Sequence, residues 1–260
     1  MSKDIHSTAT LNDGQKIPYL GLGTWQSRND DCARAVTFAL NHGYDMIDTA
    51  QIYENEGKVG KGWKESDRSR ESFFLTTKIW NMNQGYQSAK RSFKTSLKKL
   101  QTDYVDLLLI HWPNIKNFSR TVETWRAMTE LQKEGLARSI GVSNFTPSLL
   151  DELIKQSDVV PAVNQVEFHI FLYQKQLAEY CREKHIQLEA YSPLARGKFL
   201  DNPTLQQVAQ KHGKSTAQVM LAWLVQHDII AIPKSVHEQR ILDNSDIYFG
   251  LDEEIGRAHV

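Results

Sequence analysis

Short apolar runs alternate with amphipathic segments along most of the chain. The run at 105–111 is almost continuously apolar, which is typical of a strand that is covered on both faces. By contrast, Cys32, Val36 and Leu40 recur at every fourth residue, which predicts a helix with one buried stripe. The same reasoning predicts strands at 19–23, 45–48, 73–78, 105–111, 137–142, 162–167, 187–191 and 229–233, with helices between them.

Eight strands that alternate with about eight helices predict parallel strands joined by right-handed crossovers. Two architectures fit this pattern: a closed (β/α)8 TIM barrel and an open doubly wound sheet. The open sheet usually carries a G-x-G-x-x-G motif after its first strand, whereas Gly21 and Gly23 are followed by no third glycine. The sequence therefore favours the α/β barrel. An Asp-Gly pair at 13–14 adds an N-terminal β-hairpin at about 8–18, because both residues accept a positive φ.

Length and charge narrow the functional classes. The 260 residues suit a single barrel domain spanning 1–260. Lys and Arg together number 31, as do Asp and Glu, so the excess of basic charge that nucleic-acid binding requires is absent. No apolar stretch is long enough to span a bilayer, the N-terminus shows no secretory pattern, and the two cysteines lack metal-ligand spacing. We therefore expect a cytoplasmic protein, monomeric by default, with no metal, no nucleic-acid partner and no membrane segment.

Ionisable side chains stand at the ends of three successive predicted strands. Asp48 ends the second strand, Lys78 the third and His111 the fourth, while Tyr53 follows Asp48 in the next loop. In a TIM barrel the carboxyl ends of all strands face one mouth, where active sites lie. Each residue alone has a structural explanation: a cap for Asp48, a solvated lysine, a strand-end histidine, a packed tyrosine. Their joint occurrence favours one catalytic group.

The chemistry of these four residues suits the reduction of a carbonyl group. A lysine in an apolar pocket needs a counter-charge, and Asp48 is the nearest candidate. A neighbouring ammonium lowers the pKa of a phenol, so Tyr53 beside Lys78 is expected to protonate a developing alkoxide. His111 can hydrogen-bond and orient the same oxygen. The set holds no base-activated nucleophile and no carboxylate cage for a metal, so a cofactor has to supply the hydride.

At these residues the sequence resembles the aldo-keto reductases, especially the short bacterial-type members that reduce 2,5-diketo-D-gluconate and other small carbonyls. The likeness runs over nearly the whole chain. The segments that carry it are GLGTW at 21–25, GYDMIDTAQIYENE at 43–56, LTTKIW at 75–80, DYVDLLLIHWP at 103–113, GLARSIGVSNF at 135–145, VNQVEFH at 163–169, AYSPLARGKFLDNP at 190–203 and IPKS at 232–235. The resemblance implies an NADP-dependent oxidoreductase in which Asp48, Tyr53, Lys78 and His111 form a catalytic tetrad.

The resemblance also implies where NADPH/NADP+ binds. It places Ser143, Asn144 and Gln165 on the nicotinamide carboxamide, Tyr191 on the ring, Ser192, Pro193 and Leu194 along the pyrophosphate, Lys234, Ser235, Val236 and Arg240 at the 2′-phosphate, and Asn244 near the adenine. Physical chemistry agrees in part, since Asn and Gln side chains can pair both polar atoms of an amide. Lys234 and Arg240 flank a predicted helix at about 237–244, whose N-terminus favours an anion. Lys234 or Arg240 alone would be explained more simply as a solvated surface charge. The presence of both favours NADPH over NADH.

Three tryptophans, Trp25, Trp80 and Trp112, lie beside the catalytic motifs. We expect them to line an apolar pocket for a small carbonyl substrate, with core packing as the alternative. Two other functions stay open. One is a non-catalytic NADPH-binding regulatory protein on the same barrel, which would be expected to lose part of the tetrad. The other is a metal-dependent hydrolase that uses His111 and Asp48, which would need a clustered ligand set.

The last residues differ in character from the rest of the chain. The segment EIGRAHV at 254–260 has no apolar periodicity. One choice of codons for it resembles a common sequencing adapter. The sequence therefore predicts that residues from about 254 to 260 form a non-native tail, with a short, divergent natural tail as the alternative.

Overall fold

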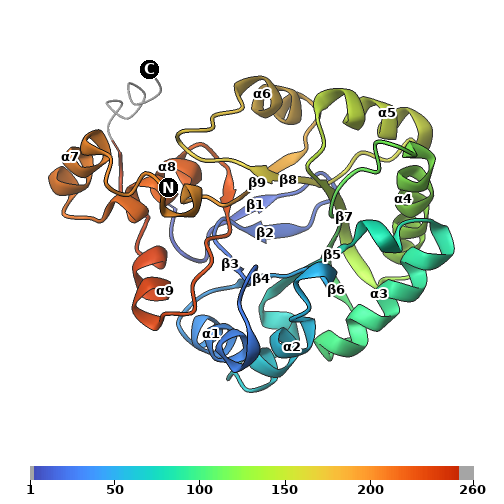
Figure 1. Ribbon diagram of the computed structural model, residues 1–260, viewed down its shortest axis with the longest axis horizontal. Helices are drawn as coiled ribbons and strands as arrows, with labels where there is room; N and C mark the ends of the chain where they lie inside the picture. Colours follow the sequence, from blue (N-terminus) through green and yellow to red (C-terminus); the bar gives the residue numbers. More distant parts are fainter. Residues whose placement is uncertain (1–2, 252–260) are drawn as a thin grey trace.

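The computed structural model describes residues 3–251 and contains an eight-stranded parallel sheet that curls into a barrel (Figure 1). The strands are β3 (Leu22–Gly23), β4 (Met46–Asp48), β5 (Phe74–Ile79), β6 (Val105–Ile110), β7 (Ala137–Ser143), β8 (Val163–Glu167), β9 (Gln187–Tyr191) and β10 (Ile230–Ala231). Strands that follow one another in sequence are also neighbours in the sheet, and every pair is parallel. The predicted (β/α)8 barrel is therefore confirmed.

Backbone hydrogen bonds between the first and last strands close the barrel. The N–H of Gly21 donates to the carbonyl of Ala231 at 2.9 Å, and the N–H of Gly23 donates to that of Pro233 at 3.0 Å. A Cβ on Gly23 would lie 2.7 Å from the carbonyl oxygen of Ile232, which no side chain tolerates against backbone. Glycine is therefore required here because the two strands approach so closely.

Helices surround the barrel on its outside (Figure 1). They are α1 (Asn29–Asn41), α2 (Glu56–Lys64), α3 (Tyr86–Leu100), α4 (Phe118–Lys133), α5 (Pro147–Ser157), α6 (Lys175–Glu183), α7 (Pro203–His212), α8 (Thr216–Gln226) and α9 (Glu238–Ser245). Their starts follow local chemistry: Asn202 caps α7 by accepting the N–H of Leu205, and Ser215 forms a capping box with Gln218 on α8. None of the helices in the described part of the chain is long and apolar enough to cross a membrane.

The predicted hairpin is present as β1 (Thr8–Thr10) and β2 (Lys16–Pro18), which pair in antiparallel fashion. Its residues Leu11 and Ile17 are buried. The side chain of Asn12 donates to the carbonyl of Pro161, just before β8 begins. The hairpin therefore lies at the amino ends of the strands, away from the end where a barrel places its active site.

Element boundaries differ from prediction mainly at the seam of the barrel. The strand expected at 229–233 is regular only over Ile230–Ala231, because Pro233 has no N–H with which to continue a ladder. The strand expected at 19–23 is regular only over Leu22–Gly23, although Leu20 still bridges to Ala231. Two helices, α7 and α8, occupy the connection between β9 and β10. The predicted non-native tail at 254–260 lies outside the described residues.

Candidate active site

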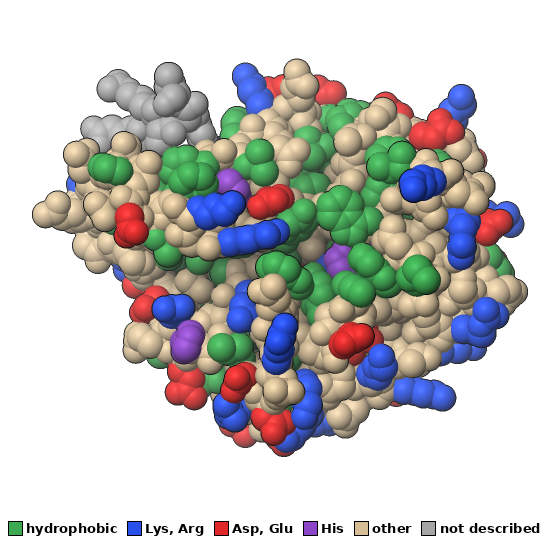
Figure 2. Space-filling model, viewed as in Figure 1, with side chains coloured by type: hydrophobic (Ala, Val, Ile, Leu, Met, Phe, Trp, Pro, Cys, Tyr) green, Lys and Arg blue, Asp and Glu red, His purple; other side chains and the backbone are tan. Residues whose placement is uncertain are grey.

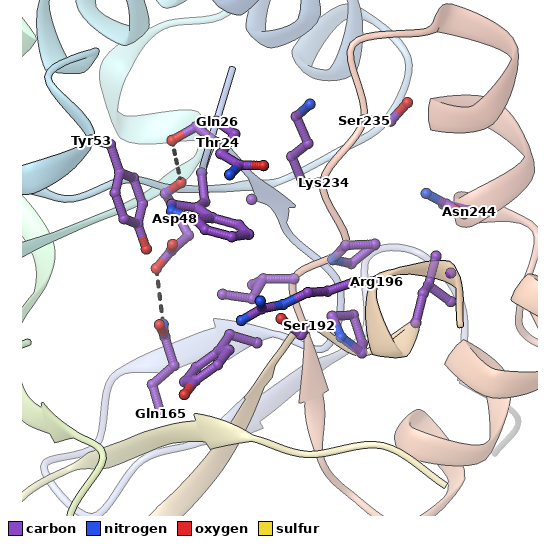
Figure 3. Close-up of a pocket in the computed structure, with 18 of the residues that line it drawn as sticks. Thr24, Gln26, Asp48, Tyr53, Gln165, Ser192, Arg196, Lys234, Ser235 and Asn244 are labelled. Carbon is purple, nitrogen blue, oxygen red and sulfur yellow. Dashed lines mark hydrogen bonds between the residues drawn. The ribbon is translucent and has the colours of Figure 1, made fainter. Parts of the chain in front are cut away.

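A cavity of about 740 Å³ opens at the carboxyl ends of the strands. Figure 2 shows it as a hollow near the middle of the visible face, with hydrophobic side chains around it. The predicted site residues that line it are Trp25, Asp48, Tyr53, Trp80, His111, Trp112, Asn144, Gln165, Tyr191, Ser192, Pro193, Leu194, Lys234, Ser235, Arg240 and Asn244. In Figure 3, Asp48, Tyr53 and Gln165 lie at one end, and Ser235 and Asn244 at the other. Ser143, Val236 and Lys78 do not line the cavity.

Lys78 lies directly beneath the catalytic end of the cavity and is completely removed from solvent. Its Nζ donates to Oδ1 of Asp48 at 2.6 Å, to the carbonyl of Thr49 at 2.9 Å and to the hydroxyl of Tyr53 at 3.4 Å. The three hydrogens of the ammonium are thus all used, which is the condition for burying a charge. Burial is the largest influence and lowers the pKa of Lys78, but Asp48, Tyr53 and Glu189 together raise it by more, so the net pKa is above the ordinary value and the ammonium stays charged.

The pKa of the Tyr53 phenol is shifted in the opposite direction from the one expected. Burial is the largest influence and raises its pKa, while Lys78 lowers it, and the net pKa is above the ordinary value. The expected net lowering by Lys78 is therefore wrong for this structure, because desolvation of the phenolate exceeds the attraction of the ammonium. The tyrosine is consequently protonated at neutral pH and can act as a proton donor.

His111 follows β6 and is electrically neutral. Burial, with a smaller contribution from Lys78, lowers its pKa to about 3. Its Nδ1 is buried without a hydrogen-bond partner, and an N–H hidden without an acceptor is costly. The single proton of the neutral ring therefore belongs on Nε2, which is left as the donor for a ligand. The rings of Tyr53 and Trp80 hold the imidazole edge-on, at centroid distances of 5.6 and 5.3 Å.

A second polar group extends from β7 to β9. Asn144 donates to the carbonyl of His111 and to Ser143 Oγ, both at 3.0 Å, and accepts from the hydroxyl of Tyr191 at 2.8 Å. Ser143 donates to the carbonyl of Gln165 at 2.8 Å. The structure therefore brings these four predicted residues together, although Ser143 is buried behind Asn144 rather than on the cavity wall.

The far end of the cavity is cationic. Lys234 and Ser235 follow β10, and Arg240 and Asn244 lie on α9. The predicted helix at 237–244 is present one residue later, as Glu238–Ser245. Val236 packs against the core rather than lining the cavity. Two cationic side chains, Lys234 and Arg240, thus line the same end of the cavity as the carboxyl group of Asp243.

Two of the three tryptophans lie open to solvent at the mouth. Trp25 is 41% exposed and Trp112 is 44% exposed, while Trp80 is half-buried against His111. Large apolar side chains that stay exposed are not packing the core. Their position on the cavity wall favours the expected pocket over core packing.

Comparison with known proteins identifies the family and its fold. The model of the aldo/keto reductase family matches residues 19–255. The chain belongs to the aldo/keto reductase family. The chain is 48% identical over 256 residues to a glyoxal reductase of Bacillus subtilis, covering 98% of this chain and 92% of that one. An aldo/keto reductase from Brucella melitensis, known from its crystal structure, has a TM-score of 0.93 and 49% identity, with 97% of each chain covered. A Bombyx mori aldo-keto reductase in complex with NADP has a TM-score of 0.90 and 37% identity, with 96% and 91% covered.

These findings confirm several expectations. The resemblance to short bacterial aldo-keto reductases, the oxidoreductase class and the NADP(H) cofactor are supported by the family and its relatives. They speak against the non-catalytic regulatory alternative. Among the described residues, no group of three or more His, Cys, Asp or Glu side chains could hold a metal ion.

Several residues in or beside the cavity were not predicted from the sequence, and three of them have notable contacts or burial: Thr24, Arg196 and Glu189. Thr24 Oγ1 donates to the carbonyl of Asp48 at 2.9 Å and fixes the backbone there. Arg196 reaches from the segment after β9 to lie 5.1 Å over the ring of Trp25, which is a cation–π contact across the cavity. Glu189 is buried one layer below the mouth. Neither the arginine nor the glutamate stands at a strand end, so the strand-end rule could not find them.

Proposed function

We propose that this aldo/keto reductase uses NADPH to reduce small aldehydes and ketones, with Tyr53 as the proton donor. One observation carries the proposal: a protonated phenol, a charged ammonium and a neutral imidazole converge at one end of the cavity, where Lys78 Nζ lies 3.4 Å from the Tyr53 hydroxyl and the Tyr53 and His111 ring centroids are 5.6 Å apart. A metal-dependent hydrolase would need a cluster of metal ligands at this place. A non-catalytic regulatory protein would not need a proton-donating phenol beside a buried ammonium and a neutral imidazole.

The residues that line the cavity fit the cofactor from end to end. Amide side chains of Asn144 and Gln165 lie beside the catalytic group with their N–H bonds already used inside the protein, so their oxygens are the atoms that can accept from the amino group of a carboxamide. Lys234 and Arg240 lie at the other end, where a 2′-phosphate needs cations. Ser192, Pro193 and Leu194 line the wall between the two ends. When bound, NADPH supplies the hydride, and the rest of the reaction depends on side chains of this chain.

The proton moves along a short path. The Tyr53 hydroxyl donates its proton to the carbonyl oxygen as that oxygen gains charge, leaving a phenolate. Lys78, 3.4 Å away, stabilises that phenolate, and Asp48 keeps Lys78 charged. The Nε2–H of His111 donates to the same carbonyl oxygen and aims it at the phenol. Because His111 is neutral, it orients the oxygen without competing as an acid.

The mouth favours small carbonyls, because its walls are largely aromatic, with the guanidinium of Arg196 over Trp25 as the charge described at this wall. Its walls at this end are Trp25, Trp80 and Trp112, and Lys78 is already paired with Asp48. The similar Bacillus subtilis protein is called a glyoxal reductase. We therefore place small 1,2-dicarbonyls such as methylglyoxal first among the substrates. We also propose that the chain acts as one barrel domain, as a monomer and in the cytoplasm.

The test is the loss of NADPH absorbance at 340 nm with a panel of glyoxal, methylglyoxal, diketogluconate, glyceraldehyde, nitrobenzaldehyde and small diketones. The proposal expects turnover with several of them, the highest kcat/KM with a small dicarbonyl, and no effect of a chelator. An absence of NADPH oxidation across the panel, or activity that a chelator removes, would contradict it.

A further inference from the structure

Glu189 is a carboxyl group enclosed inside the barrel. It lies on β9 two residues before Tyr191, and side chains two apart on a strand point to the same face. Tyr191 lines the cavity, so Glu189 points inward one layer deeper. Its side chain is fully buried. A lone carboxyl in the interior of a barrel is costly unless it has a partner, and no step proposed above uses it.

The partner of Glu189 is Gln165, which lies directly opposite it on β8. The amide nitrogen of Gln165 donates to Oε2 of Glu189 at 2.8 Å and to Oδ2 of Asp48 at 2.9 Å. A primary amide has two N–H bonds, and both are thereby used. The amide oxygen is then the atom that Gln165 presents to the cavity. Figure 3 shows the bond between Gln165 and Asp48.

We propose that Glu189 is a positioning residue: with Asp48 it clamps the amide of Gln165 so that the oxygen, not the nitrogen, faces the nicotinamide carboxamide. The same contact also positions Asp48. The amide nitrogen of Gln165 donates to Oδ2 of Asp48, while Lys78 donates to Oδ1. This inference rests on the proposed function, since it needs Gln165 to meet the cofactor.

The charges around Glu189 explain how the clamp is tolerated. The ionisable groups that face Glu189 are Asp48 on β4, Tyr53 in the turn after β4 and Lys78 on β5. The neighbouring strands place Gln165 of β8 and Ile230 of β10 in register with Glu189. One ammonium cannot balance two carboxylates. Burial, then Asp48, raise the pKa of Glu189 to about 8. Glu189 thus carries a proton at neutral pH, while its Oε2 still accepts from Gln165.

Two substitutions separate the clamp from simple packing. Glu189→Gln retains an oxygen that accepts from Gln165 but cannot ionise. Glu189→Leu keeps a similar volume but has no acceptor, so the amide of Gln165 is held by Asp48 alone. Thr76→Val is the matched control, because the Thr76 hydroxyl is also buried in the barrel but has no hydrogen-bond partner. Each variant is compared with wild type by circular dichroism, by fluorescence titration of NADPH and by pH profiles of kcat for alcohol oxidation.

Glu189→Leu is expected to weaken NADPH binding about tenfold, the effect of one lost hydrogen bond to a buried partner. Glu189→Gln is expected to bind NADPH as wild type does, yet to lose an inflection near pH 8 from the profile. Thr76→Val is expected to change neither. If Glu189→Leu does not fold, the pH profile of Glu189→Gln decides alone, and an unchanged profile overturns the proposal. Wild-type NADPH affinity in a folded Glu189→Leu overturns it as well.

Failure of this inference is distinguishable from failure of the proposed function. If wild type turns over carbonyls with NADPH while both Glu189 variants match it in affinity and pH profile, only the clamp is wrong. If wild type itself neither binds NADPH nor reduces any carbonyl, the proposed function is wrong, and the clamp with it.

Discussion

The ammonium of Lys78 donates to Oδ1 of Asp48 at 2.6 Å, with both side chains inside the barrel and almost no contact with water. The pair sits below the phenol of Tyr53, so the charge that stabilises a phenolate is itself held in place by a carboxylate. The stability and the activity of the protein should therefore both depend on Asp48 and Lys78.

Asp48→Asn is expected to lower the free energy of unfolding by about 3–5 kcal/mol, because it leaves the buried ammonium of Lys78 without its counter-charge. Urea denaturation followed by circular dichroism measures the change. The control is Asp30→Asn, which removes an exposed partner of Lys58 and should leave the urea midpoint where it is. Equal midpoints for Asp48→Asn and wild type would show that the pair does not stabilise the barrel.

Lys234→Ala and Arg240→Ala are each expected to raise KM for NADPH roughly tenfold to a hundredfold, since each removes a charge-assisted hydrogen bond to phosphate. KM for NADH should stay the same, because NADH has no 2′-phosphate. Steady-state kinetics with both cofactors make the measurement, and Lys155→Ala on the exposed face of α5 is the control. An equal rise of KM for both cofactors would place these residues elsewhere than at the 2′-phosphate.

His111 should make the protein less stable in acid. Its pKa is about 3 when folded against 6.5 as the ordinary value, so between those values the unfolded chain binds the proton more readily. Stability from this group is complete above pH 6.5 and falls by about 1.4 kcal/mol per pH unit below it, until pH approaches 3. His111→Gln cannot titrate and should show a flatter fall between pH 7 and pH 4.5 in urea denaturation. Parallel slopes for the two proteins would contradict the burial of a neutral histidine.

Trp112→Ala is expected to raise KM for an aromatic aldehyde such as nitrobenzaldehyde about tenfold, through loss of apolar contact. A much smaller effect is expected for methylglyoxal, which has less surface to bury. Because Trp112 is 44% exposed, folding should be unaffected. Met82→Ala is the control, since Met82 is 80% exposed and does not line the cavity. If Trp112→Ala changes KM for both substrates no more than Met82→Ala does, Trp112 does not contact the substrate.

The barrel fold could be predicted from the sequence because the alternation of an apolar strand with an amphipathic helix is repeated eight times. Eight buried runs each bounded by helical periodicity leave few arrangements, and the missing third glycine at Gly21 and Gly23 separated the two that remained. The seam was the least predictable part. Strand pairing near Pro233 depends on how the last strand packs against the first. These two strands are more than 200 residues apart in sequence, so the local pattern of residues does not predict their contact.

The position of the candidate site also followed from sequence, since Asp48, Lys78 and His111 stand at or beside strand ends. The net pKa of Tyr53 did not follow, because it depends on how deeply packing buries the phenol. Glu189 was missed for a related reason: a glutamate within the short run QLEAY looks like an exposed strand residue until the barrel closes around it.

The role of Tyr53 as the proton donor is tested most directly by Tyr53→Phe, which removes one hydroxyl from the cavity and little else. With Tyr53 as the proton donor, kcat for carbonyl reduction is expected to fall by about a thousandfold or more, since general acid catalysis contributes on the order of 10²–10⁴. NADPH should still bind with wild-type affinity in a fluorescence titration. Full retention of activity, or loss of NADPH binding together with activity, would contradict the role of Tyr53 as the proton donor.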